Sequence, residues 1–187
     1  MIIVISGPSG VGKGTVVSKL LKLDKKLVRS ITCTTRKPRK GEKDGRDYYF
    51  LTTEEFFKRV KEKRLAEFAF VHGNYYGTPK ENLEKAQTDE EDVILQIDVQ
   101  GAKKIKNSYP DALLIFLLPP SMEVLEKRLA KRGTETEEEK ENRLKRAEEE
   151  IEERVFYDYI VVNDDLDATV NEIYEIIKEE RKKRSSG

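Results

Sequence analysis

Short apolar runs alternate with long polar stretches along this chain, and the runs predict the strands of a sheet. Each run is continuous, which is typical of strands buried on both faces in a parallel sheet covered by helices. We expect these strands at residues 2–5, 93–97, 113–118 and 159–162, with residues 27–32 as a candidate fifth strand.

Apolar residues at helical spacing occupy the segments between these runs. Val17, Leu20 and Leu21 would share one face of a helix, and a similar stripe lies between residues 170 and 177. Ser121 follows two prolines and is the expected N-cap of another helix. The alternation of strands and helices predicts an α/β core of the doubly wound kind.

Residues 32–80 interrupt this alternation with clustered Gly, Pro, Arg and Tyr. Two short aromatic runs, at 48–51 and 68–71, are strand candidates. Thr52 and Glu55 have the spacing of a capping box, so a helix should begin between those runs.

Residues 132–155 form a second interruption, which is very polar and helical in pattern. Its apolar stripe is thin and consists of Leu144, Ala147 and Ile151. A helix with so little apolar surface packs weakly, so we expect this segment to move.

Composition narrows the class of protein. Lys plus Arg number 36 and Asp plus Glu also number 36, which argues against a general nucleic-acid or membrane-binding role. The single cysteine, Cys33, excludes an internal disulfide framework, and the single histidine, His72, leaves too few ligands for a structural zinc site. No stretch approaches the roughly 18 consecutive apolar residues of a membrane span. These observations predict a soluble cytoplasmic protein, and we assign no role to Cys33 or His72.

A glycine-rich loop follows the first predicted strand and precedes the first predicted helix. Its glycines would let backbone N–H groups surround phosphate oxygens, and a lysine would add a full charge near the β- and γ-phosphates. Gly14 stands where a magnesium-contacting Ser or Thr is expected, which leaves Thr15 as the nearest hydroxyl. The alternative is a glycine turn that binds no ligand. The proposed ATP-binding loop comprises Gly7, Pro8, Ser9, Gly10, Val11, Gly12, Lys13, Gly14 and Thr15.

Six further segments resemble the guanylate kinase family in order and without large gaps, from near residue 2 to about residue 177. The resemblance implies a P-loop NTPase fold with a parallel sheet flanked by helices, a small mixed α/β GMP-binding subdomain and a helical lid. It implies one domain over 1–187, with a core (1–31, 82–123 and 156–187), a GMP-binding subdomain (32–81) and a lid (124–155). The matching segments are TCTTRKPRKGE (32–42), GRDY (45–48), GNYYGT (73–78), IDVQG (97–101), KRGTET (131–136) and VNDDLD (162–167).

The resemblance assigns four residues to the phosphate of GMP. Arg36 and Arg39 carry planar guanidinium groups that can hold a phosphate through two hydrogen bonds each. Tyr48 and Tyr76 would add hydroxyl donors without adding charge. The alternative for this basic stretch is a solvated surface loop.

Two acidic residues match the family's guanine-reading positions. Guanine presents N1–H and a 2-amino group as donors, and the carboxylates of Glu67 and Asp98 could accept from them. The alternative for Glu67 is the solvent face of a strand, and the alternative for Asp98 is a magnesium ligand at the end of its strand. Thr32 and Thr78 match hydroxyls that the family uses beside these acids.

Three arginines and a loop complete the implied site. Arg128, Arg132 and Arg143 match lid arginines that neutralise charge on the transferring phosphoryl group, although helix salt bridges are an equal alternative for Arg143. Asn163 and Asp164 match the loop that borders the adenine of ATP. The implied catalytic residues are Lys13, Arg36, Arg132 and Arg143.

The implied reaction converts ATP and GMP into ADP and GDP, with dGMP as a further expected substrate. Mg²⁺ would be held mainly by ATP phosphates and water, with Thr15 as the one protein hydroxyl considered. No nucleic-acid, membrane or obligate protein partner is expected. Two rival functions stand beside this one: a non-catalytic guanylate-kinase-like binding module, and a related kinase that phosphorylates another small molecule such as a ribose bisphosphate.

Overall fold

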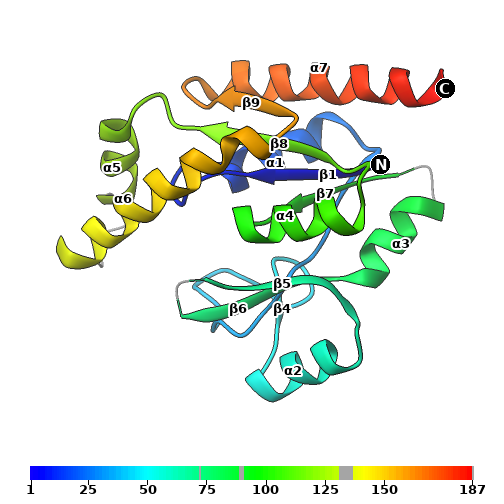
Figure 1. The fold of residues 1–187 in the computed structure, drawn as a ribbon, viewed down its shortest axis with the longest axis horizontal. Helices are drawn as coiled ribbons and strands as arrows, with labels where there is room; N and C mark the ends of the chain where they lie inside the picture. Colours follow the sequence, from blue (N-terminus) through cyan, green and yellow to red (C-terminus); the bar gives the residue numbers. More distant parts are fainter. Residues whose placement is uncertain (72, 89–90, 131–136, 187) are drawn as a thin grey trace. The chain divides into compact units, whose positions relative to one another are not determined.

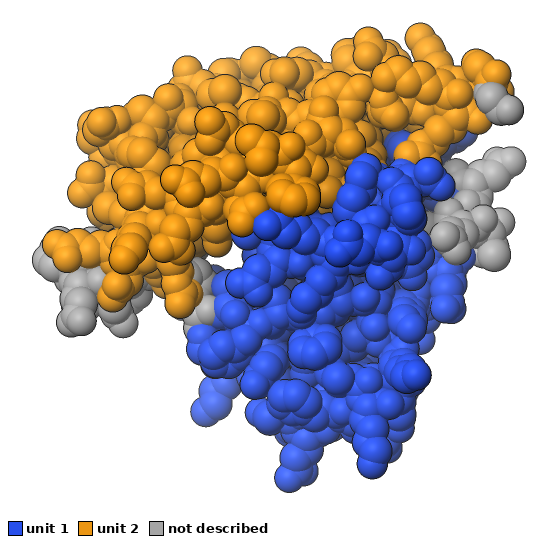
Figure 2. Space-filling view, in the orientation of Figure 1, with its two compact units in different colours: residues 1–3, 26–112 blue, residues 4–25, 113–187 orange. Residues whose placement is uncertain are grey.

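The chain forms two compact units in a computed structural model that describes residues 1–71, 73–88, 91–130 and 137–186. One unit contains residues 1–3 and 26–112, and the other contains residues 4–25 and 113–187 (Figure 2). The boundary falls within the first strand. The three-part division into core, GMP-binding subdomain and lid stays a prediction.

The main sheet is parallel and has five strands, in the order β2-β7-β1-β8-β9. Its register pairs Val28 with Val93 and Phe116 with Ile160. The predicted strands are confirmed, and the candidate fifth strand is shorter than residues 27–32. The bounds are β1 (Ile2–Ser6), β2 (Leu27–Arg29), β7 (Asp92–Gln96), β8 (Leu113–Leu118) and β9 (Tyr159–Val162).

One strand departs from the expected burial on both faces. Strands β1, β7 and β8 are buried almost throughout, as their continuous apolar runs predict. In β9, however, Ile160 and Val162 keep 45% and 49% of their surface exposed. The prediction was therefore wrong for β9, because this strand is the last in the sheet order and only its Val161 face is covered.

A smaller sheet of four strands belongs to the first unit, in the order β4-β3-β6-β5. Strands β5 and β6 pair as an antiparallel hairpin in which Phe68 faces Gly77. The two aromatic strand candidates lie in β4 and β5, while β6 was not predicted. The bounds are β3 (Cys33–Thr34), β4 (Tyr49–Phe50), β5 (Leu65–Val71) and β6 (Asn74–Pro79).

Helix α2 (Thr53–Lys61) begins at the predicted capping box. The Thr52 hydroxyl accepts a hydrogen bond from the backbone N–H of Glu55 (3.1 Å), and the Glu55 carboxylate accepts one from the N–H of Thr52 (2.7 Å). Phe56 of this helix is fully buried against Cys33 and Leu65, which together form the core beneath the small sheet. Helix α3 (Lys80–Thr88) follows β6, and helix α4 (Val99–Ser108) packs against β5 (Figure 1).

The second unit contains the remaining helices, α1 (Lys13–Leu23), α5 (Met122–Ala130), α6 (Glu137–Glu152) and α7 (Leu166–Ser185), with a short 3-10 helix η1 (Glu153–Phe156). Ser121 caps α5 as predicted, since its hydroxyl accepts from the N–H of Val124 (3.3 Å). Helix α7 buries its predicted stripe and packs against α1, where Arg181 donates to Asp24 (2.6 Å).

Helix α6 has the thin apolar stripe that its sequence predicts. Ala147 is buried in a small cluster with Leu125 and Leu129 of α5, and Leu144 packs at its margin. Helices α5 and α6 lie next to each other (Figure 1). The remaining side chains described along α6 are partly or fully exposed. The thin contact agrees with weak packing, whereas the movement expected of this segment stays a prediction.

Candidate active site

The glycine-rich loop lies between β1 and α1 and has a backbone that only glycine adopts easily. Gly7, Gly10 and Gly12 have φ angles of +141°, +88° and +103°. A Cβ atom on Gly7 would lie 2.4 Å from the carbonyl oxygen of Leu117, so a side chain there would also collide with β8. Helix α1 begins directly after Gly12 with no side-chain cap and no acidic residue in its first turn. Its N-terminal N–H groups and positive dipole end therefore suit a phosphate.

The lysine of the motif curls back over the start of the loop. The Lys13 ammonium donates to the carbonyl oxygens of Gly7 (2.5 Å) and Pro8 (3.1 Å). Gly14 is half-buried, and Thr15, in the first turn of α1, is exposed. The loop therefore carries one ammonium, on Lys13, and two hydroxyls, on Ser9 and Thr15, beside its backbone N–H groups.

Two predicted ATP-binding residues contact the backbone of the loop. The Asn163 side-chain amide donates to the carbonyl oxygen of Val11 (2.6 Å), and Arg128 donates to that same oxygen (3.4 Å) and to the carbonyl of Asn163 (3.1 Å). Asn163 is buried, whereas Asp164 is exposed. The adenine contact expected of this pair stays a prediction.

The lid arginines are only partly covered by the structure. Arg132, in the segment 131–136, lies outside the described residues. Arg143 lies on α6 and is partly exposed. Neither the lid role nor the salt-bridge alternative for Arg143 is tested by this geometry.

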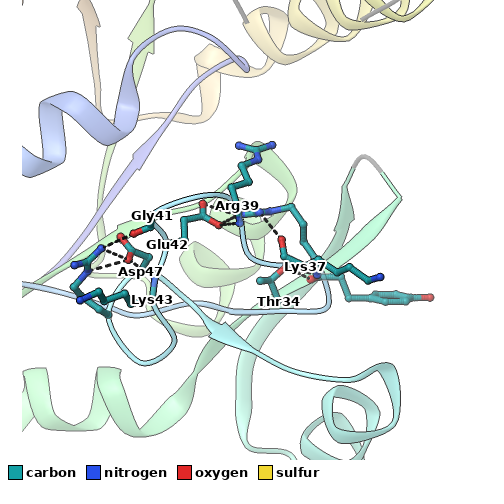
Figure 3. A network of polar contacts seen from close by, with 10 residues as sticks. Thr34, Lys37, Arg39, Gly41, Glu42, Lys43 and Asp47 are labelled. Carbon is teal, nitrogen blue, oxygen red and sulfur yellow. Dashed lines mark hydrogen bonds and ion pairs between the residues drawn. The ribbon is translucent and has the colours of Figure 1, made fainter. Parts of the chain in front are cut away.

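The basic segment between β3 and β4 is an organised network and not a loose loop (Figure 3). The Glu42 carboxylate accepts two hydrogen bonds from one guanidinium nitrogen of Arg36 (2.8 and 3.0 Å) and one from the backbone N–H of Arg39 (2.7 Å). The Arg36 side chain is 13% exposed, so the solvated-loop alternative is wrong for Arg36. The Arg39 side chain is exposed and extends away from the network (Figure 3).

Charge and aromatic rings hold Arg36 in place. Burial opposes the charge of Arg36, but Glu42 outweighs burial and raises the pKa of the guanidinium. The guanidinium carbon lies 5.3 Å from the centre of the Tyr48 ring, which meets the Tyr76 ring edge to face at 6.2 Å. The structure thus brings Arg36, Tyr48 and Tyr76 together, with Arg39 on the same turn of chain. Such a set of cation and hydroxyls is suited to a phosphate.

Glu67 is a buried carboxylate on β5. Its side chain faces inward with only 5% of the residue exposed, so the solvent-face alternative is wrong. The Thr78 hydroxyl donates to Glu67 Oε1 (2.6 Å). Burial, and then the nearby charge of Asp98, raise the pKa of Glu67 to about 7 against the opposing effects of Thr78 and Lys104.

Asp98 lies beside Glu67 at the end of β7. Asp98 Oδ1 accepts from the N–H of Gly101 (2.8 Å) and so caps helix α4. A Cβ atom on Gly101 would lie 2.9 Å from Glu67 Oε2 and 3.2 Å from Asp98 Oδ1, so Gly101 lets the two carboxylates converge. Thr32 is also buried, next to β3. The choice between guanine and magnesium for Asp98 stays open.

Sequence reasoning gave no role to Glu42 or Gly101, although both lie in segments that carry the family resemblance. Cys33 is fully buried, and burial raises the pKa of its thiol to about 11, which disfavours the thiolate form. His72 lies outside the described residues.

Within the described part of the chain, no group of three or more His, Cys, Asp and Glu side chains is placed to hold a metal ion, and no helix is long and apolar enough to span a membrane.

Comparison with known proteins identifies the family of this chain. The family model described as guanylate kinase matches residues 1–180. Similar relatives include the guanylate kinase of Caldanaerobacter subterraneus subsp. tengcongensis, 49% identical over 97% of this chain and 88% of that protein, and the guanylate kinase of Rickettsia felis, 47% identical over 98% and 95%. Among solved structures, the guanylate kinase of Anaplasma phagocytophilum matches with a TM-score of 0.81 at 39% identity, covering 96% of this chain and 85% of that one. The chain therefore belongs to the guanylate kinase family.

Proposed function

We propose that this chain is a guanylate kinase that transfers the γ-phosphoryl group of ATP to GMP and yields ADP and GDP. The observation that carries the proposal is the buried Glu67 carboxylate, 5% exposed and hydrogen-bonded to Thr78, in a chain of this family. A carboxylate in such a place is costly unless a ligand offers it donors, and guanine offers two on one edge.

ATP binds at the loop of residues 7–15 in this proposal. Backbone N–H groups at the start of α1 hold the phosphate oxygens, and the Lys13 ammonium leaves its two carbonyl acceptors for the β- and γ-phosphates. A phosphate oxygen is the stronger acceptor for an ammonium, since the bond is charge-assisted on both sides.

GMP binds in the first unit in this proposal. Arg36, Arg39, Tyr48 and Tyr76 take its phosphate, and Glu67 accepts from the guanine N1–H and 2-amino groups. Adenine has no N1–H at the matching position, so AMP would leave the buried carboxylate without donors. Asp98, Thr32 and Thr78 support the same base.

The transfer step needs placement and neutralisation of charge. An oxygen of the GMP phosphate forms a bond to the γ-phosphorus while the bond to the β-γ bridging oxygen breaks, and ADP leaves with that oxygen. Lys13 neutralises charge on the phosphates of ATP and Arg36 neutralises charge on the phosphate of GMP, and Arg132 and Arg143 are proposed to add positive charge for the transferring group.

Magnesium fits this site as an ion carried by ATP. The described residues place the hydroxyls of Ser9 and Thr15 in the loop and no group of three or more acidic ligands, and Mg²⁺ is commonly bound by phosphates, water and few protein groups. When bound, the ion would neutralise charge on the β- and γ-phosphate oxygens. A cytoplasmic location, where both nucleotides are available, belongs to the same proposal.

The two rival functions differ in what the chain should carry. A binding module without activity has no need of Lys13 at the phosphate loop, and a kinase for another acceptor has no need of Glu67 beside Asp98. Both features are present, and the curated relatives named above are guanylate kinases.

The test is an assay of ADP release with GMP, dGMP, AMP and IMP as acceptors. We expect GMP and dGMP to be phosphorylated, IMP to be used poorly because it lacks the 2-amino group, and AMP to be inactive. Equal rates with GMP and AMP would refute the role of Glu67, and no ADP release with any acceptor would favour the binding module.

A further inference from the structure

The carbonyl group of Val11, in the middle of the phosphate loop, is held by two side chains from distant parts of the sequence. The Asn163 amide donates to it at 2.6 Å from 152 residues away, and Arg128 donates to it at 3.4 Å. Asn163 is itself fixed, since it is 5% exposed and its backbone N–H donates to the carbonyl of Leu118 (2.8 Å). Arg128 donates a second hydrogen bond, to the backbone carbonyl of Asn163 (3.1 Å), and so links Asn163 to Val11.

Peptide geometry gives this contact a consequence for the next residue. In a trans peptide the C=O of one residue and the N–H of the next point in opposite directions. With the Val11 carbonyl held toward Asn163, the N–H of Gly12 must point to the other side of the loop. Gly12 is the N-cap of α1, so its N–H lies where a phosphate at the helix N-terminus would accept it.

The space around Gly12 is shaped by the same side chain. A Cβ atom on Gly12 would lie 2.6 Å from the Asn163 side-chain nitrogen, with no comparable contact to any backbone atom. The Asn163 side chain therefore occupies the space that a side chain on Gly12 would need. This close contact restricts the conformations that the loop can adopt at Gly12.

We propose that Asn163 is a positioning residue for the phosphate loop: it holds the Val11 carbonyl and so directs the Gly12 N–H toward the triphosphate, with Arg128 as its support. This role differs from contact with adenine, because it acts on any ligand that carries the phosphates. It rests on the proposed assignment of residues 7–15 to ATP.

The test compares a nucleotide with a probe that has no base. Asn163→Leu keeps nearly the same size but removes the donor without adding charge, and Asn163→Ala is a second variant in case leucine is not accommodated. Asn171→Ala, on an exposed position of α7 in the same unit, is the matched control. Dissociation constants are measured calorimetrically for ATP, inorganic tripolyphosphate and GMP, together with the thermal midpoint of the ligand-free protein.

We expect both Asn163 variants to bind ATP and tripolyphosphate about tenfold more weakly, as loss of a buried hydrogen bond predicts, with GMP affinity and the Asn171→Ala control unchanged. Weaker binding of ATP with unchanged tripolyphosphate affinity would overturn the proposal in favour of an adenine contact. Unchanged affinity for both, or an equal loss for GMP, would also overturn it. If the wild-type protein binds neither ATP nor tripolyphosphate, the assignment of the loop fails first.

Discussion

Replacement of Glu67 by glutamine should make the ligand-free protein more stable at neutral and alkaline pH. The buried carboxylate has a pKa raised from 4.5 to about 7, chiefly by burial. Glutamine has nearly the same shape, carries no charge at any pH and keeps an oxygen that can accept from the Thr78 hydroxyl. The substitution therefore removes the cost of the buried charge and leaves the packing on β5 in place.

The direction of the pH effect follows from where the proton is held. Between about pH 4.5 and pH 7 the folded protein keeps a proton on Glu67 that the unfolded chain has lost, so stability falls as the pH rises through this range. The stabilising contribution of the protonated Glu67 side chain to the free energy of unfolding is fully present below about pH 4.5 and is lost above about pH 7. Moving the pKa from 4.5 to about 7 corresponds to about 3 kcal/mol.

The measurement is the free energy of unfolding in urea, followed by circular dichroism at pH values between about 5 and 8. Stability of the wild-type protein should fall relative to Glu67→Gln by most of that 3 kcal/mol across this range. Glu54→Gln, at an exposed position in the first turn of α2, is the control for loss of one surface carboxylate and should track the wild type. Saturating GMP should reduce the difference above pH 7, since guanine supplies donors to the ionised form.

A difference between wild type and Glu67→Gln that stays constant from about pH 5 to pH 8 would refute the reasoning, because the carboxylate would then titrate alike in the folded and unfolded chains. A wild-type protein that becomes more stable relative to the variant as the pH rises would refute it more strongly. That result would place a cation close to Glu67 as its dominant partner.

Three further outcomes are expected at other residues. Lys13→Ala should lower turnover at least about a thousandfold with an unchanged circular dichroism spectrum, and near-normal turnover would contradict the phosphate-loop assignment. Glu42→Gln should raise the KM for GMP about tenfold with the KM for ATP unchanged, because Arg36 loses its charged partner, and steady-state kinetics with each substrate varied will show this. Gly101→Ala should likewise raise the KM for GMP about tenfold, since the new methyl group meets Glu67 Oε2 at 2.9 Å, while thermal unfolding should show no loss of helix stability. An equal change in the KM for ATP would contradict either of the last two.

The main sheet could be predicted from sequence because its strands are buried on both faces, which leaves a continuous apolar signal. The same rule misjudged β9, whose apolar residues Ile160 and Val162 lie partly in solvent at the last position of the sheet. A strand's place in the order is decided by partners far away in the chain, and a local run of residues carries no record of it. Strand β6 escaped prediction for a related reason, since its Gly77 and Pro79 are typical of turns.

Residues of the site were predictable where the chemistry is local. The glycines and lysine of the phosphate loop have a fixed spacing, and the capping box of α2 spans four residues. The role of Glu42 was not predicted, because its contact with Arg36 depends on the fold of the turn that brings the two side chains together. The contact of Asn163 with Val11 was missed because no periodic pattern links residues so far apart.

The close approach of Gly12 and Asn163 also couples the two positions against substitution. A side chain gained at position 12 would meet the Asn163 amide at once, in addition to the strain of a φ angle of +103°. A smaller residue at position 163 would relieve this contact, but it would also release the Val11 carbonyl. A chain that lost Asn163 in this way would bind phosphate less tightly although its glycine motif is unchanged.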